Sequence, residues 1–323
     1  MKKLFYLFVV MSLSLTACEP PTGPDKPGDN GGSSSEGTEV PVLPKDSASS
    51  KPIIPSEPSH PSDPESPDSP SEPYVSHFVA KPFSVSATKT ITFSSGNLQY
   101  HAANKEWRFA PTQMDYVGNE NANIADDYNG WIDLFGWGTG NHPTNKSNDY
   151  NDYTTFVDWG SNQIGSYAPN TWRTLTYEEW EYIINERSNA SNLIGVAQVN
   201  GVNGLILLPD GWTCPSGVTF KSGFADNDGD EYYASYHDGD EYYASYQSFS
   251  ASEWSKLEDS GAVFFPAAGI RFGSRVDGVQ DLGYYWSATN YYSIADYLTF
   301  GSDKATIGSS SCRDGQSVRL VQD

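Results

Sequence analysis

Residues 78–323 alternate between hydrophobic and polar positions in short runs, and Gly, Pro, Asn and Asp interrupt these runs at close intervals. Short alternating runs bounded by turn residues are typical of β-strands. A strand is expected wherever such a run contains β-branched or aromatic residues. The predicted strands are 89–93, 106–110, 204–208, 262–265, 284–287, 297–300 and 317–321.

Two segments follow the period of an α-helix instead. One begins after Thr176, which can cap the first turn, and it carries an apolar stripe of Trp180, Ile183 and Ile184. The other covers 252–259 and ends before a glycine. Many short strands with two modest helices and long loops predict an α+β fold, not a doubly wound sheet.

The first residues have the three parts of an export signal. Lys2 and Lys3 precede an apolar run over 4–15, and small residues then lead to Cys18. The apolar run is shorter than the ~20 residues that span a bilayer. The sequence at 15–18 (LTAC) resembles a lipobox, which implies that 1–17 is removed and that Cys18 carries a membrane-anchoring lipid. The alternative is an ordinary secretory signal with a chance cysteine.

Residues 18–77 contain little that could build a core. Ser, Pro, Asp, Glu and Gly dominate, which is typical of disordered chain. Prolines recur at every third position, as polyproline II would place them on one face of an extended rod. We expect a spacer between the lipid and a domain at 78–323, and a ligand for an SH3-like partner is the alternative. The spaced prolines are Pro52, Pro55, Pro58, Pro61, Pro64, Pro67, Pro70 and Pro73.

The amino-acid composition limits the classes of molecule that the protein is expected to bind. A formal net charge of −22 repels phosphate backbones, so nucleic-acid binding is not expected. The 21 Tyr, 15 Phe and 9 Trp supply side chains that build cores and recognition surfaces. Cys214 and Cys312 could pair outside the cytoplasm, but a sequence does not show whether their Cα atoms lie close enough.

Several motifs resemble Bacteroides-type surface lipoproteins related to the Fibrobacter major paralogous domain. This resemblance implies a C-type-lectin-like fold, shared with sulfatase-modifying factors, and an outer-membrane, surface-exposed location. Trp137, Trp180 and Trp286 are then expected in the core, and Arg319 in a buried salt bridge or as a donor to carbonyl groups. The motifs are 83–86 (FSVS), 93–100 (FSSGNLQY), 107–110 (WRFA), 132–138 (IDLFGWG), 264–271 (FFPAAGIR), 283–287 (GYYWS) and 316–321 (QSVRLV). In addition, 172–182 (WRTLTYEEWEY) resembles a helix start in sulfatase-modifying factors.

The same fold is similar to that of variable proteins of diversity-generating retroelements. Those proteins vary the stretch that corresponds to 288–314 here, which implies a binding face for an unknown protein or glycan. Its Tyr, Asn, Ser and Asp residues suit recognition, although the stretch could equally be a polar loop of an invariant domain. Alternation over 295–300 predicts that Leu298 and Phe300 point inward and Tyr297 and Thr299 outward. The candidate ligand-binding residues are Tyr291, Tyr292, Asp296, Tyr297, Ser302, Asp303, Lys304, Ser309, Ser310, Arg313 and Asp314.

Residues 228–236 (DGDEYYASY) recur at 238–246. Acidic residues in both copies could supply oxygen ligands to Ca²⁺. The pattern departs from an EF-hand loop, because Glu231 stands at its sixth position and His237 at its twelfth. We favour repeat slippage in a surface loop without an ion. The calcium candidates are Asp226, Asp228 and Asp230.

An enzyme is not expected. The sulfatase-modifying relatives oxidise a cysteine with two C-terminal cysteines and copper, whereas Cys312 is the one cysteine in the comparable region here. The five His residues have no recognisable nucleophile or zinc context, so no cofactor is expected. The alternatives to a ligand-binding lipoprotein are a structural or adhesin subunit of a surface assembly, and an oxidase relative that has lost its cysteine pair.

Overall fold

A computed structural model of the chain describes residues 76, 78–225 and 240–323. The chain divides into two units, 1–67 and 68–323, and every described residue belongs to the second. The predicted signal, Cys18, nearly all of the predicted spacer and the calcium candidates Asp226, Asp228 and Asp230 therefore lie outside the described residues. No helix among the described residues is long and apolar enough to cross a membrane.

The described residues have an α+β fold of five small sheets with few short helices, as the sequence predicts. The sheets have the strand orders β1-β2-β15, β4-β3-β5, β8-β6-β7-β9, β10-β11 and β12-β13-β14. Strand pairing within them is antiparallel, except that β6 and β8 run parallel. The strands are β1 (Phe83–Ser84), β2 (Thr90–Phe93), β3 (Leu98–His101), β4 (Glu106–Phe109), β5 (Trp131–Ile132), β6 (Ile194–Val199), β7 (Val202–Leu207), β8 (Ser248–Phe249), β9 (Val263–Pro266), β10 (Ile270–Phe272), β11 (Arg275–Asp277), β12 (Gly283–Tyr291), β13 (Ile294–Phe300), β14 (Ala305–Ser311) and β15 (Val321–Gln322). The helices are α1 (Tyr177–Glu181), α2 (Asp240–Tyr246) and α3 (Ala251–Asp259), a π-helical turn over Tyr182–Glu186, and short 3₁₀ turns at Gly118–Asn123, Tyr150–Tyr153, Trp159–Ser161 and Ala190–Asn192.

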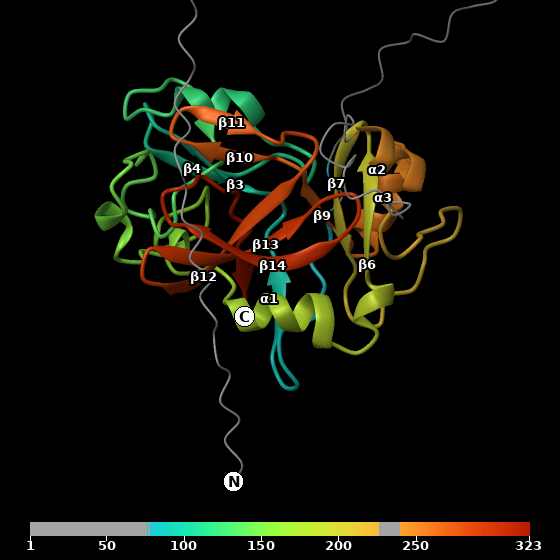
Figure 1. Ribbon diagram of the computed structural model, residues 1–323. Coiled ribbons are helices and arrows are strands. Elements are labelled where there is room, and N and C mark those ends of the chain that lie inside the picture. The colour runs from blue at the N-terminus through green and yellow to red at the C-terminus, as the bar shows by residue number, and fades with distance from the viewer. Residues whose placement is uncertain (1–75, 77, 226–239) are drawn as a thin grey trace, which may run out of the picture. The chain divides into compact units, whose positions relative to one another are not determined.

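The central sheet is the meander of β12, β13 and β14, which separates two parts of the core. In Figure 1, β6, β7, α2 and α3 lie on one side of this meander and the green loops on the other. Leu298 and Phe300 of β13 join one buried cluster, as predicted. Ala295, on the opposite face of β13, joins a second cluster with Trp286. Tyr297 lies on that same face and is half-buried, so its predicted outward position is only partly correct.

Both predicted helices are confirmed, and both begin with a capping box. The Thr176 hydroxyl accepts from the Glu179 amide, and the Glu179 carboxylate accepts from the Thr176 amide. Ser250 and Glu253 do the same for α3, so this helix begins slightly earlier than its apolar pattern indicated. Each box satisfies two backbone donors that a helix start otherwise leaves unpaired.

The second copy of the repeat is not simply a surface loop, so that part of the expectation is wrong. Residues 240–246 form α2, and the Tyr243 side chain is fully buried in the first core cluster. Its hydroxyl donates to the carbonyl of Asp281 at 2.9 Å. Tyr243 and Tyr246 are three positions apart, about one turn of the helix, so both can pack against the same core.

The predicted strand at 317–321 is also wrong for most of its length, since β15 begins at Val321. Residues 316–320 are extended and buried, but they bond to several different elements. The carbonyl of Val318 accepts from Leu98, that of Leu320 accepts from Ser94, and Ser317 bridges to Tyr285. The segment alternates polar and apolar residues as a strand does, but its backbone bonds to several elements in turn instead of to one partner strand.

The core residues named from motifs are buried as expected. Trp137, Trp180 and Trp286 are nearly inaccessible. Arg319 is buried and donates to acceptors, among them Gln113 Oε1 at 2.7 Å and the carbonyl of Phe264 at 3.3 Å. Arg319 therefore satisfies buried acceptors, as one of the two readings predicted.

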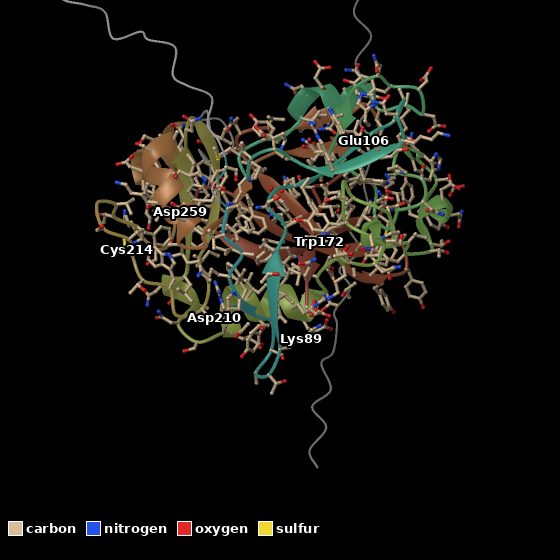
Figure 2. The ribbon with its side chains drawn as sticks, turned by 180° about the vertical axis from the view of Figure 1, so that it is seen from behind. Lys89, Glu106, Trp172, Asp210, Cys214 and Asp259 are labelled. Atoms are coloured by element: carbon tan, nitrogen blue, oxygen red, sulfur yellow. The ribbon has the colours of Figure 1, made fainter. Side chains whose placement is uncertain are left out.

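The two described cysteines do not form a disulfide. Both thiols are free, Cys214 exposed and Cys312 buried. Figure 2 shows Cys214 at the margin of the fold on the same side as Asp259 of α3, whereas Cys312 belongs to the cluster around Trp286. Burial raises the pKa of the Cys312 thiol to about 12.

Candidate ligand-binding surface

The predicted binding residues do not form one face, because two groups of them lie at opposite ends of the central meander and the others lie within its strands. Tyr291 and Tyr292 lie at the β12–β13 hairpin tip, and Arg313 follows the end of β14 near the same tip. Ser302, Asp303 and Lys304 form the β13–β14 turn at the other end, where the Ser302 carbonyl accepts from Ala225. The seven residues of β13 separate the two groups by roughly 20 Å. One small ligand therefore cannot contact both ends.

Several predicted residues have structural contacts instead of free side chains. Asp314 is buried, and burial raises its pKa. The ring of Tyr297 packs 5.9 Å from Trp286 and lies over Gly308, where a Cβ would come within 2.9 Å of it. The hydroxyl of Ser309 donates to Asp296 at 2.7 Å across the strand pair, and Ser310 accepts from Gln316.

The hairpin tip is the most exposed aromatic feature among the described residues. Tyr291 and Tyr292 are 75% and 79% exposed, and their rings contact each other edge to face at 4.5 Å. Tyr292 has a φ of 57°, in the left-handed region. It is the first residue of a two-residue hairpin loop, a position at which a positive φ normally selects Gly.

A groove lies beside this tip, which we call the tyrosine groove. Tyr150, 55% exposed, stands in it with Tyr292, and the cavity volume is ≈ 480 Å³. Tyr150 begins the 3₁₀ turn Tyr150–Tyr153, in a loop that the sequence analysis did not single out. The groove is lined by Tyr150, Thr154, Asn290, Tyr292 and Ser293.

One side-chain bond and two backbone bonds hold the tip against that loop and the core. Arg313 donates from Nη1 to the carbonyl of Asn148 at 3.0 Å, and the Cys312 amide donates to the carbonyl of Ser293 at 2.9 Å. The Cys312 carbonyl in turn accepts from Trp137 at 2.8 Å. Arg313 therefore positions the groove walls relative to each other.

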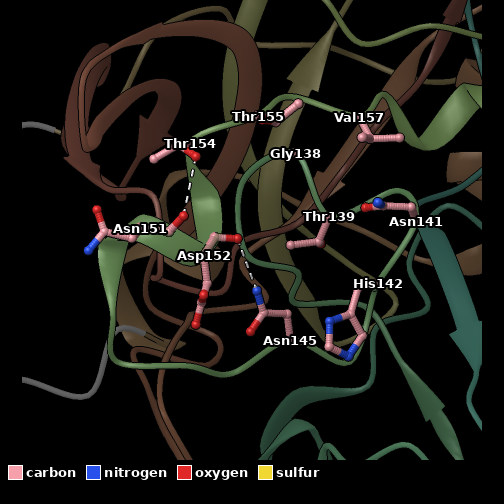
Figure 3. A pocket seen from close by; sticks show the side chains of 10 residues that line it. All are labelled: Gly138, Thr139, Asn141, His142, Asn145, Asn151, Asp152, Thr154, Thr155 and Val157. Carbon is pink, nitrogen blue, oxygen red and sulfur yellow. Dashed lines mark hydrogen bonds between the residues drawn. The ribbon is translucent and has the colours of Figure 1, made fainter.

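A second cavity, which we call the amide pocket, lies on the other side of the same 3₁₀ turn. Its volume is ≈ 400 Å³, and Figure 3 shows Asn, Thr, His and Asp side chains around it. Asn145 donates to the carbonyl of Asp152 at 3.4 Å, and Thr154 donates to the carbonyl of Asn151 at 3.2 Å. The pocket is lined by Gly138, Thr139, Asn141, His142, Asn145, Asn151, Asp152, Thr154, Thr155 and Val157.

The tryptophan motif at 132–138 holds this pocket in place. Trp137 is buried and donates from Nε1 to the carbonyl of Ser287 at 3.0 Å. Gly138 has a φ of 67°, and a Cβ there would lie 2.8 Å from the Cα of Phe156. The Gly138 carbonyl then accepts from Val157 at 3.0 Å, which brings both ends of the loop together. Only glycine permits this close approach with that φ.

His142 and Asp152 line the amide pocket, and Asp126 lies beside His142. The His142 Nε2 lies 3.5 Å from Asp126 Oδ1, and both side chains are exposed. The Thr144 hydroxyl donates to the same carboxylate and lowers the pKa of Asp126. Among the described residues, no three His, Cys, Asp or Glu side chains gather as a metal site would require.

Comparisons with protein-family models, with curated proteins and with solved structures find no match.

The loop at 138–157 is the part of the surface that the sequence analysis missed. Its composition could have indicated it, because 141–155 (NHPTNKSNDYNDYTT) combines Asn, Asp, Thr and Tyr as recognition loops do. The sequence could not show that this loop faces the β12–β13 hairpin, since Arg313 and Asn148 are 165 positions apart.

Proposed function

We propose that this protein is a lipid-anchored lipoprotein of the bacterial outer membrane, exposed at the cell surface. Its residues 78–323 have a C-type-lectin-like fold and bind a protein or glycan ligand at the hairpin tip and the tyrosine groove. Variation of 288–314 by a diversity-generating retroelement remains part of the proposal, and a reverse transcriptase gene beside a near-identical template repeat would support it.

The observation that carries the proposal is Tyr292. A bulky residue at positive φ destabilises the fold by roughly 1–2 kcal/mol. The exposed Tyr292 ring buries little apolar surface, so it does not offset this strain. Strain of this kind gathers at functional sites. Binding through the ring explains why an aromatic residue stands where glycine is the stable choice.

The thiols support a role that does not depend on cysteine chemistry. A thiol with a pKa of about 12 is not ionised at neutral pH, and the thiolate is the reactive form. Cys214 and Cys312 are not paired, since Cys312 is buried in the cluster around Trp286 and Cys214 is exposed. This favours binding over the oxidase alternative.

The second candidate function is a subunit of a surface assembly, and β14 favours it. This strand pairs on one side with β13 and, among the described residues, has no strand on its other side. An open edge can accept a strand from another chain. Light scattering of the full chain in detergent distinguishes the two candidates, since a ligand-binding protein can remain monomeric and an assembly subunit cannot.

The direct test removes the exposed rings. The triple variant Tyr150→Ala, Tyr291→Ala, Tyr292→Ala of the full chain, held in lipid nanodiscs, is compared with wild type for binding to panels of soluble polysaccharides and glycoproteins. We expect a loss of at least about tenfold in affinity, because aromatic anchors dominate binding energy. Phe272→Ala is the matched control, since Phe272 is 41% exposed beside the separate β10–β11 turn. Equal binding by the triple variant would contradict the proposed site.

A further inference from the structure

We propose that the ligand is a neutral oligosaccharide that runs from the tyrosine groove across Thr154 into the amide pocket. This inference rests on the proposed function and adds the ligand class and a second subsite.

The two cavities are neighbours on one short turn, because Thr154 lines both of them. Tyr150 faces the groove, while Asn151 and Asp152 line the pocket. Their volumes of ≈ 480 and ≈ 400 Å³ each lie within the ~300–1,000 Å³ of small-ligand sites. A linear ligand with repeating units can occupy both, one unit or more in each.

The groove has the chemistry to stack against sugar rings. The face of an aromatic ring is electron-rich and attracts polarised C–H groups, which a pyranose presents on one of its faces. Tyr150 and Tyr292 line the groove from two different segments, and both are exposed, so a sugar can reach their rings. Asn290, with its amide donating to the Tyr292 carbonyl at 3.0 Å, keeps its side-chain oxygen beside them.

The amide pocket has the chemistry to bind hydroxyl groups. An Asn side chain both donates and accepts, and a Thr hydroxyl does the same, so together they suit adjacent sugar hydroxyls. Asn141 and Thr155 are exposed in the pocket, and neither side chain bonds to another described residue. Asn145, by contrast, is buried and accepts from the Ser147 amide at 3.0 Å, so it shapes the pocket wall.

Charge disfavours an acidic ligand. Neither cavity is lined by Lys or Arg among the residues that the structure describes, and Asp152 lines the amide pocket. The chain carries a net charge of −22, which repels sulfated or uronic-acid polymers at long range. A protein partner commonly needs about 800 Å² on each side. Two narrow, hydroxyl-binding cavities in a row fit a neutral sugar chain better than such a broad surface.

The test measures binding of the full chain in nanodiscs to immobilised neutral polymers (mannan, xylan, galactan and β-glucan) and to acidic ones (heparin and polygalacturonate). We expect binding to at least one neutral polymer and to neither acidic one. Tyr292→Ala weakens that binding about tenfold or more, whereas Tyr292→Phe, which keeps the ring, stays within about threefold.

The double variant Asn141→Ala, Thr155→Ala tests the second subsite. It weakens binding of the longer oligosaccharides cut from that polymer, and it leaves the shortest ones that bind unchanged, because those occupy the groove alone. Phe272→Ala matches wild type in every arm. Binding to no neutral polymer, preference for an acidic one, or insensitivity to both sets of variants overturns the inference.

A further arm separates this failure from failure of the proposed function. A glycoprotein is offered before and after enzymatic removal of its sugars. Retention of the stripped protein, abolished by the triple tyrosine variant, keeps the proposed function and overturns the sugar ligand. Binding that no tyrosine or amide variant changes overturns both.

Discussion

At Tyr292 the backbone conformation favours glycine, yet the residue carries a large aromatic side chain. The positive φ favours glycine, while the ring stands in solvent at the tip of the hairpin. Tyr291, its neighbour, has a similar exposure but lies in the regular strand β12. The pair allows the cost of the left-handed conformation to be measured within one hairpin.

We expect Tyr292→Gly to be about 2 kcal/mol more stable than Tyr291→Gly. Both changes remove the same ring contact, but glycine relieves strain at 292 and weakens the strand at 291. Urea denaturation of the two variants and wild type measures the free energies of unfolding. If Tyr292→Gly proves no more stable than Tyr291→Gly, the strain that we attribute to Tyr292 is not present.

Asp133 is a second residue of interest, because its surroundings change the pKa of its carboxyl group. It is fully buried, and burial raises its pKa from 3.8 to about 6. The amides of Val117 and Asn121 donate to its two oxygens at 2.7 and 2.8 Å, and these bonds oppose the rise. The folded protein therefore holds a proton on Asp133 more tightly than the unfolded chain does.

This difference predicts a pH dependence of stability with a definite sign. Between about pH 4 and pH 6 the unfolded chain binds fewer protons at this carboxyl than the folded one, so stability decreases as pH rises. The step from 3.8 to about 6 corresponds to about 3 kcal/mol. Between pH 3.5 and pH 7, the free energy of unfolding of wild type should fall by this amount relative to that of Asp133→Asn. Urea denaturation across that pH range measures the difference. Parallel pH profiles for the two proteins would contradict the assignment.

At the scale of elements, the repeat and the hairpin show how packing selects structure. Residues 240–246 become a helix because Tyr243 can fill the core beside Phe265 and Leu298. In β12 the pairing with β13 shifts between Trp286 and Asn290, and there Thr289 accepts from the Tyr177 amide at the start of α1. Such irregularities are common beside functional sites, and this one lies at the base of the exposed tip.

We expect Tyr243→Ala to lower the free energy of unfolding by about 3–5 kcal/mol, because it empties a fully buried aromatic site. Tyr243→Phe keeps the ring and loses the bond to the Asp281 carbonyl, so it should cost about 1 kcal/mol. Thermal and urea denaturation measure both. Near-wild-type stability of the alanine variant would show that α2 does not belong to the core.

At the scale of the whole molecule, the proposal joins a lipid at Cys18, a proline-spaced segment and a recognition domain. The spacer, if fully extended as polyproline II, would reach roughly 190 Å at ~3.1 Å per residue. That length suits a domain whose partners lie outside the cell. The net charge of −22 would also keep the body of the protein away from an anionic membrane surface.

We expect Cys18→Ala to release the protein from the membrane. Wild type should partition into the detergent phase of a cloud-point extraction and take up labelled fatty acid, and the variant should do neither. Cys214→Ala, which leaves the proposed lipid site intact, is the control. Detergent partitioning of Cys18→Ala would show that the chain is held by something other than this lipid.

The sequence by itself determined the local features of this fold. The cap at Thr176, the two predicted helices, most of the predicted strands and the inward side of Leu298 and Phe300 agree with the structure, since each depends on neighbours a few positions away. The motif tryptophans were also assigned correctly to the core. The anchor and the spacer stay predictions from sequence.

The tertiary structure alone decided where the candidate site lies. It divided the stretch 288–314 between two ends of a sheet, and it placed the loop around Tyr150 against the hairpin tip through Arg313. It also set the positive φ of Tyr292, which no residue preference would have predicted. The physical reason is that a binding surface is made by long-range packing, and the free energy that brings Arg313 to Asn148 is distributed over the core between them.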